Sequence, residues 1–373
     1  MTDFLVIGGG IVGQVAAIEL AEAGARVTIV DAEMNAGSTA NAGSLHVQMQ
    51  SRFMRLYPEQ VPNMEASLPL YVAAAEEWVR LDHRHGPFEL VRKGGLMLAE
   101  DDAQMAFLEQ KMKREAVHGV SVELLDRPAL DRIAPWLGPQ IVGAELCHDE
   151  GKLNPLVANA RLRATAEGLG IALHTDLIVG LESRPDGIEA TGKRTRYSAD
   201  RVVVAAAWGA GALTRGLGVD IPSRAEPLHM NITEACETRI GHLVQHAERS
   251  ITLKQFASGQ VVIGGGWAAR DRGRDTVPAV VPASMLGNVA LAARLVPSIG
   301  GLRVIRTWAG MNTTIDGASV IGPLASHDRV IMAIPGDAGY TLGPLVARMA
   351  AACAQGSDLT EEARRFSPAR FAA

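Results

Sequence analysis

The sequence predicts an α/β fold in which a Rossmann-like dinucleotide-binding domain is interleaved with an α+β domain. A glycine-rich turn at residues 8–13 joins the apolar run 4–7 to a helical stretch. Two later runs, 201–207 and 329–333, have the continuous hydrophobicity of parallel strands buried on both faces. Short strand-like segments between these runs predict a second domain built on a mixed, largely antiparallel sheet.

The order of these segments indicates that the chain leaves its dinucleotide-binding domain twice and returns twice. We expect the first domain to comprise residues 1–84, 141–215 and 305–373. The second, substrate-binding domain would then comprise residues 85–140 and 216–304.

The glycine turn has the spacing of a dinucleotide-binding fingerprint. Gly8 permits the tight turn, Gly10 allows the backbone to approach a pyrophosphate, and Gly13 allows the helix to lie close to the strand. Asp31 follows a second strand at the distance where a carboxylate binds ribose hydroxyls, which disfavours a 2′-phosphate. A glycine-rich turn without a ligand is the alternative, and the motif alone does not distinguish NAD from FAD.

Composition excludes several classes of protein. The 373 residues carry a net charge of −5, and no block of basic residues is present, so nucleic acid is not an expected partner. Cys147, Cys236 and Cys353 are isolated from one another, which predicts no disulfide framework and no metal or iron–sulfur site. The chain start lacks a basic region and contains Asp3 and Glu19, so we expect a cytoplasmic protein without a membrane span.

The small polar stretch 36–46 predicts a loop, either lying along a flat ligand or forming a surface connection. Helical spacing of apolar residues occurs over 63–80, where Pro69 is expected to interrupt the helix. A C-terminal helix is expected to begin at Gly343, with Pro344 in its first position. Its first amides would point toward a bound ligand and stabilise negative charge there.

Three glycines at 264–266 resemble a second phosphate-binding loop. The residues after Trp267 lack helical periodicity, so the helix dipole that such a loop needs is missing. We therefore interpret these glycines as the end of a strand in the second domain, where the backbone can approach a ring or a substrate closely.

Five segments together resemble the D-amino-acid oxidase superfamily of flavoproteins, which includes glycine oxidase and sarcosine oxidase. These segments are GGGIVG with its following Asp31, STANAG, VVVAAAWGAG, RTWAGMNTTIDGASVIGP and AIPGDAGYTLGP. The resemblance implies that the dinucleotide is FAD. It implies that FAD contacts Gly8, Gly10, Ile11, Val12, Gly13, Asp31, Ala32, Ser38, Thr39, Asn41, Ala42, Gly43, Ser44, Leu45, Ala206, Trp208, Gly336, Asp337, Ala338, Gly339, Tyr340 and Thr341.

The substrate segment differs from that of relatives that oxidise simple amino acids. Met311 and Asn312 stand where those relatives carry an arginine that clamps the substrate carboxylate, and Asp337 stands where they commonly carry a histidine. Glycine and plain D-amino acids are therefore not the expected substrates.

The segments STANAGSLHVQ, EGKLNP, ITLKQ and VIGGGW resemble the β-type subunits of opine oxidase, D-hydroxyproline dehydrogenase and hydrogen cyanide synthase. The resemblance implies an FAD-dependent amine dehydrogenase subunit that oxidises an N-substituted amino acid or imino acid, such as octopine or nopaline. Hydride would pass to flavin N5, and electrons would pass to a larger partner subunit carrying further redox centres. Oxidases of D-hydroxyproline, glycine, sarcosine or D-amino acids are alternatives, as are a non-catalytic flavin relay subunit and, more distantly, an NAD-dependent dehydrogenase.

Two side chains are candidates for a catalytic role. Lys254 lies on a predicted strand and is a candidate for a place near flavin N5 or the substrate carboxylate, and His46 follows the flavin loop. A solvated strand lysine and a structural histidine are the alternatives. Arg306 is a candidate replacement for the missing clamp. The expected substrate contacts are His46, Lys254, Trp267, Met311, Asn312 and Gly339.

Overall fold

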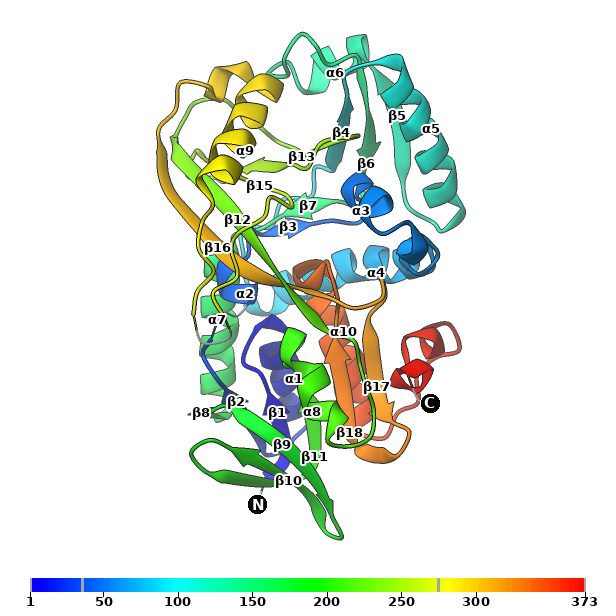
Figure 1. Cartoon of the computed structure of the whole chain (residues 1–373), viewed down its shortest axis with the longest axis vertical. Coiled ribbons are helices and arrows are strands. Elements are labelled where there is room, and N and C mark those ends of the chain that lie inside the picture. Colours follow the sequence, from blue (N-terminus) through cyan, green and yellow to red (C-terminus); the bar gives the residue numbers. More distant parts are fainter. Residues whose placement is uncertain (1, 35–36, 274–275, 372–373) are drawn as a thin grey trace.

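The computed structural model describes residues 2–34, 37–273 and 276–371, and in it the chain folds around two large sheets (Figure 1). The first sheet has the central order β17-β18-β11-β1-β2-β8. Its strands are β17 (Val320–Leu324), β18 (His327–Ile334), β11 (Arg196–Val204), β1 (Thr2–Ile7), β2 (Val27–Asp31) and β8 (Ala172–Thr175), with β10 (Gly187–Gly192) and β9 (Ile178–Arg184) added beside β11.

The centre of the first sheet is parallel, as the unbroken apolar runs predict. Strand β1 pairs in parallel with β11 and β2, and β11 pairs in parallel with β18. Helices α1 (Ile11–Glu22), α10 (Gly339–Ala354) and α7 (Pro155–Gly168) contribute to the apolar core over one face, whereas α8 (Ala210–Arg215) packs into the cluster on the other. Because both faces are covered, the central strands are buried throughout their later residues.

The second sheet has the order β16-β12-β15-β14-β13-β4-β6-β5, and every neighbouring pair is antiparallel except β13–β4. Helix α9 (Pro282–Leu295) packs on this sheet, and α5 (Asp102–Val117) and α6 (Arg127–Ile133) lie at its far end. The strands are β16 (Val304–Thr314), β12 (Arg224–Ala235), β15 (Gln260–Gly264), β14 (Thr252–Gln255), β13 (Leu243–His246), β4 (Gly95–Ala99), β6 (Gly143–Cys147) and β5 (Val122–Asp126).

These findings confirm an α/β fold with a largely antiparallel second sheet, but they place two strands differently from the expected domain ranges. Strand β6 lies in the range 141–215 and β16 lies at the start of 305–373, yet both pair within the second sheet. The long strands β12 and β16 run from the second sheet toward the first (Figure 1). We call the second sheet with its helices the substrate half and the first sheet with its helices the cofactor half. Strand β16 carries the chain from the substrate half to the cofactor half.

Short elements join the two halves. Helix α2 (Gly37–Ala40), strand β3 (Ser44–Leu45) and helix α3 (Ser51–Leu56) follow one another, and β3 pairs with β7 (Gly151–Lys152). The long helix α4 (Val61–His85) runs through the middle of the molecule (Figure 1). Among the described helices, none combines the length and the apolar character needed to cross a membrane.

Two prolines lie inside helices, contrary to the sequence expectation. Pro69 does not interrupt α4, and α10 begins at Gly339 rather than at Gly343, so Pro344 is an interior residue. Pro344 has no N–H to donate to the carbonyl of Tyr340. The indole Nε1 of Trp78 in α4 donates to that carbonyl instead, at 2.9 Å. The proline is therefore accommodated because a neighbouring helix supplies the missing donor.

We expect Trp78→Phe to lower the free energy of unfolding by about 1–3 kcal/mol, because it leaves the buried Tyr340 carbonyl unpaired. The variant Pro344→Ala restores a backbone N–H at residue 344. In that background the same Trp78→Phe change should cost roughly 1 kcal/mol less, as measured by urea unfolding of all four proteins. An equal cost in both backgrounds would contradict the assigned role of Trp78.

Candidate active site

The turn between β1 and α1 has the geometry of a phosphate-binding turn. Gly8 has a φ of +108°, and a Cβ there would lie 2.4 Å from the carbonyl oxygen of Ala205. A Cβ at Gly13 would lie 1.7 Å from the carbonyl oxygen of Gly8. Only glycine fits at both positions, and the first turn of α1 consequently lies close against the end of β1.

The first turn of α1 is open toward a cavity. Gly10 precedes the helix and provides no side-chain cap, and the amide of Ile11 donates to Ser38 Oγ at 2.9 Å. Asp31 ends the neighbouring strand, where its carboxylate accepts hydrogen bonds from the amides of Gly9 and Glu33. Backbone amides, the helix dipole and an acidic residue therefore converge at one end of the parallel sheet.

A second helix also begins at this cavity. Helix α10 follows Ala338, which provides no side-chain cap, and residues 336–342 line the cavity. At Gly343 a Cβ would approach Ile11 Cγ2 to 3.0 Å, so α10 packs closely on the start of α1. The positive ends of two helix dipoles thus face the same space, which suits a ligand with one anionic part and a second part that gains negative charge.

The cavity has a volume of about 350 Å³, and most of the residues expected to contact the cofactor or substrate line it. Those that line it are Gly8, Gly10, Ile11, Val12, Asp31, Ala32, Ser38, Asn41, Ala42, Ser44, His46, Ala206, Trp208, Lys254, Met311, Asn312, Gly336, Asp337, Ala338, Gly339, Tyr340 and Thr341.

Five expected contact residues do not line the cavity. Gly13 lies behind the glycine turn, Thr39 lies in α2, and Leu45 is in the apolar core. A Cβ at Gly43 would lie 2.1 Å from the carbonyl oxygen of Leu153, so this glycine is required by backbone packing.

Trp267 is the fifth of these residues, and its assignment to the substrate is not supported by its position. The Trp267 ring lies directly against Gly287 of α9, where it leaves no room for a Cβ. Its Nε1 donates to the carbonyl of Ser250. The adjoining residues Gly264, Gly265 and Gly266 do line the cavity, so the close backbone approach expected there occurs without the tryptophan.

Lys254 is fully buried in the cavity wall, which excludes the alternative of a solvated strand lysine. Its Nζ donates to Ser44 Oγ at 2.6 Å, which connects β14 of the second sheet to the cofactor loop. Burial, with a smaller contribution from the charge of Lys152, lowers the pKa of Lys254 to about 7. Near neutral pH this amine is therefore able to exchange a proton.

A cluster of four polar side chains carries no motif along the sequence. Arg52 from α3 pairs with Glu226 on β12, and the two side chains are 13% and 19% exposed. Asn312 Nδ2 donates to Glu226 at 3.4 Å and to Asp337 Oδ1 at 3.2 Å. Burial and the nearby charge of Glu226 raise the pKa of Asp337 to about 8, so this carboxyl group holds its proton at pH 7.

Arg52, rather than Arg306, is the arginine of the cavity. A Cβ at Gly266 would lie 2.5 Å from both Cδ and Nε of Arg52, so the Arg52 side chain lies directly against this glycine. Arg306 is exposed, and its guanidinium lies over the ring of Trp308 at 5.8 Å. The sequence signal for Arg52 was its nearness to the flavin loop, six residues after His46. Arg306 is therefore not the replacement clamp.

The residues of the cavity fit FAD. The glycine turn and the start of α1 match the pyrophosphate, Asp31 matches a ribose, and the start of α10 matches the ring that is reduced.

A family model described as FAD dependent oxidoreductase matches residues 3–353. The chain belongs to this family. It is therefore an FAD-dependent oxidoreductase, and FAD is its cofactor.

Individual relatives are distant but extend over most of the chain. The B subunit of opine oxidase from Agrobacterium tumefaciens (strain Ach5) is 24% identical over 99% of this chain and 97% of its own. The beta subunit of sarcosine oxidase from Rhizobium meliloti (strain 1021) is 24% identical over 86% of this chain and 76% of its own. The crystal structure of glycine oxidase from Geobacillus kaustophilus has a TM-score of 0.85, with 20% identity and 98% coverage of both chains, and confirms the fold.

The raised pKa of Asp337 predicts a pH dependence of stability. In the unfolded chain this carboxyl ionises near pH 4, whereas in the folded protein it keeps its proton up to about pH 8. The folded state therefore binds the extra proton, and the contribution of Asp337 to stability falls as pH rises from about 4 to 8.

Asp337→Asn should remove this contribution. The free energy of unfolding of the variant minus that of the wild type should therefore be more positive at pH 8 than at pH 5, by roughly 2 kcal/mol or more. Urea unfolding of both proteins at the two pH values is the measurement. Stability curves that stay parallel across this pH range would show that Asp337 is ionised in the folded protein.

Proposed function

We propose that the chain is an FAD-dependent amine dehydrogenase subunit for an N-substituted amino acid or imino acid of the opine type, such as octopine or nopaline. The observation that carries this proposal is the pairing of Arg52, which lines the cavity, with the half-buried Glu226, beside Asn312 and Asp337 of the cavity wall. A substrate that binds Arg52 therefore also changes the surroundings of Glu226.

Arg52 suits the carboxylate of an amino acid. A guanidinium binds a carboxylate through two parallel hydrogen bonds, and it remains charged at any physiological pH. In the absence of substrate Glu226 occupies this guanidinium. A substrate carboxylate therefore competes with Glu226 for Arg52 and leaves Glu226 in need of another cation.

An opine carries that second cation. Octopine and nopaline have a guanidinium group at one end and carboxylates at the other, so a substrate of this type can satisfy Arg52 and Glu226 at once. Glycine and D-alanine have no positive group beyond the reacting amine. Because an uncompensated half-buried carboxylate is costly, the cluster favours a substrate with a distal cation.

FAD held in this cavity would supply the hydride acceptor for the carbon beside the substrate nitrogen. The chain's own residues then have to bind, orient and deprotonate the amine. We assign orientation to Arg52, and a proton-holding role to Lys254 and His46, which line the cavity on the side of Ser44. A lysine with a pKa near 7 can take the proton from an ammonium group and hold it at Nζ.

We further propose that the chain works in a hetero-oligomer that carries electrons away from FAD to a larger subunit with other redox centres. Two relatives support this by name, because the opine oxidase chain is called a B subunit and the sarcosine oxidase chain a beta subunit. The three cysteines of this chain are free and distant in sequence, so the further centres would belong to the partner.

The substrate class is tested by anaerobic mixing of the purified flavoprotein with octopine, nopaline, D-hydroxyproline, sarcosine, glycine and D-alanine. We expect bleaching of the visible flavin band by the two opines and not by glycine or D-alanine. Bleaching by glycine or D-alanine alone would overturn the opine assignment. Absence of bleaching with every compound would indicate either a relay role or a catalytic site that needs the partner subunit. Repeating the experiment with the co-purified complex distinguishes these two cases.

The role of Arg52 is tested by Arg52→Met, with Arg306→Met as the matched control on the exposed side of β16. Removing one partner of a half-buried charge pair costs about 2–5 kcal/mol, so KM for the bleaching substrate should rise roughly thirtyfold or more. The control should leave KM unchanged. A similar KM in both variants would remove Arg52 from the substrate site.

A further inference from the structure

Glu150 is a buried carboxylate outside the sequence motifs, in the turn between β6 and β7. Its side chain has no solvent exposure. Each of its hydrogen-bond partners is an N–H donor: Glu150 accepts from the amide of Val47 at 2.9 Å, from the amide of Gln48 at 3.2 Å, and from the side-chain amides of Gln48 and Gln245 at 2.9 and 3.0 Å. Since donors surround it, the group acts as an acceptor with both oxygens.

The backbone that Glu150 binds is the wall of the active-site cavity. Residues 46–50 all line that cavity, and they are not part of a strand. The amide of His46 donates to Thr341 Oγ1 at the start of α10, at 2.9 Å. The amide of Met49 donates to Glu115 of α5. Glu150, Glu115 and Thr341 together hold this segment in place.

The imidazole of His46 is the one ring of this wall that faces Glu150. Its Nδ1 is buried without a hydrogen-bond partner among the described residues and lies 3.8 Å from Glu150 Oε1. The side chain keeps 14% exposure, so the rest of the ring faces the cavity. A proton on Nδ1 would point at a carboxylate, whereas a lone pair on Nδ1 would be repelled by it.

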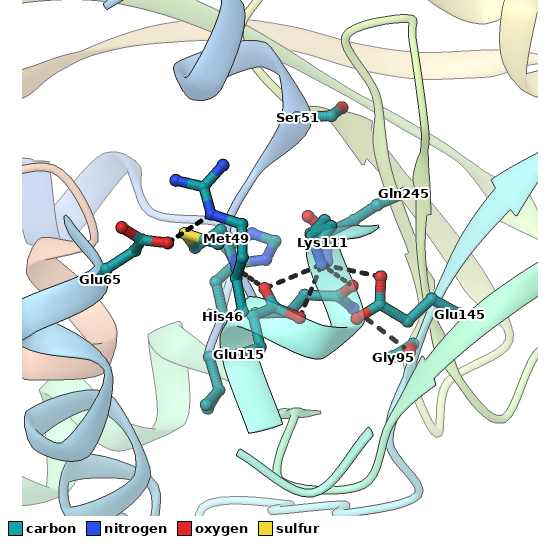
Figure 2. A network of polar contacts seen from close by, with 12 residues as sticks. His46, Met49, Ser51, Glu65, Gly95, Lys111, Glu115, Glu145 and Gln245 are labelled. Atoms are coloured by element: carbon teal, nitrogen blue, oxygen red, sulfur yellow. Dashed lines mark hydrogen bonds and ion pairs between the residues drawn. The ribbon is translucent and has the colours of Figure 1, made fainter. Parts of the chain in front are cut away.

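A neighbouring ionic cluster, centred on Lys111, makes no ion pair with Glu150 among the described residues. Lys111 is fully buried, and its Nζ bonds Glu115 and Glu145 at 2.9 and 3.0 Å and Gln48 Oε1 at 3.1 Å (Figure 2). Burial opposes the charge of Lys111, but the two carboxyl groups outweigh it and raise its pKa.

Burial raises the pKa of Glu145 to about 9. Lys111 Nζ is shared between Glu115 and Glu145 in this cluster. Glu150 receives only the neutral amide of Gln48 from this cluster.

We propose that Glu150 is a positioning residue for His46. It holds the proton of the neutral imidazole on Nδ1 and thereby leaves the Nε2 lone pair facing the cavity. In the proposed function, on which this role rests, Nε2 accepts a proton from the substrate ammonium: the substrate N–H bond breaks, an Nε2–H bond forms, and the electron pair stays on the amine nitrogen. The distance of 3.8 Å between Nδ1 and the carboxylate would shorten when the ring becomes charged.

The tautomer is read directly from imidazole ¹⁵N chemical shifts of the purified, FAD-containing protein. The chain has ten histidines, and the spectrum of His46→Asn identifies the signals of residue 46. We expect the Nδ1–H tautomer in the wild type without substrate. The Nε2–H tautomer in the wild type would overturn the proposal, whatever the substrate turns out to be.

Glu150→Gln tests the cause, with Glu145→Gln as the matched control. Both residues are buried glutamates near Lys111, but glutamine mimics the protonated form in which Glu145 already exists. We expect Glu150→Gln to shift His46 toward the Nε2–H tautomer and to lower kcat by up to about a hundredfold, with KM changed less than about threefold. Glu145→Gln should leave both the tautomer and kcat unchanged.

Two further outcomes separate the positioning role from the proposed function. An unchanged tautomer in folded, flavin-containing Glu150→Gln overturns the positioning role. A shifted tautomer with unchanged kcat supports the positioning role and removes His46 from the chemistry. If Glu150→Gln does not fold, Glu150→Asp is the second variant, because its shorter side chain moves the carboxylate away from His46 Nδ1. We then expect a smaller population of the Nδ1–H tautomer than in the wild type. An equal or larger population would overturn the proposal.

Discussion

The close contact between α1 and the end of β1 is the constraint on which the rest of the site depends. A Cβ at Gly13 would lie 1.7 Å from the carbonyl oxygen of Gly8, so the helix reaches this position only with glycine. Helix α10 then packs on the first turn of α1 through Gly343. Because each helix fixes the other, the two positive helix ends are held toward one cavity without any acidic side chain in their first turns.

Four carboxyl groups in or near the site have different surroundings. Glu226 is paired with Arg52, and Glu150 is surrounded by amide donors. Asp337 and Glu145 have no comparable set of donors among the described residues, and burial raises the pKa of each. For Asp337 and Glu145, burial is the largest cause of the raised pKa.

Sequence reasoning predicted the parts of the fold that depend on local patterns. The turn at Gly8 and its neighbouring strands follow from glycine spacing and from apolar runs, which are properties of adjacent residues. The partners of Arg52 and Glu150 could not be predicted in the same way. Glu226 is 174 residues from Arg52, and Val47 is 103 residues from Glu150, so neither contact has a pattern along the chain.

The start of α10 shows where a correct local rule led to a wrong boundary. Proline is favoured in the first turn of a helix because it lacks an N–H, and this rule predicted a helix from Gly343. The structure extends the helix to Gly339 because Trp78, 262 residues away from Tyr340 in sequence, supplies the donor. The dipole expected at this helix start is present, but it lies four residues earlier.

The cavity wall at residues 46–50 has a consequence for how proteins of this architecture can be recombined. Its amides are bound by Glu150 and Glu115 from the substrate half and by Thr341 from the cofactor half. Neither half therefore carries a complete wall by itself. A chimaera that takes its substrate half from another flavoprotein would need to import this wall together with the carboxylates that bind it. Substrate binding and cofactor seating therefore depend on the same short segment of the chain.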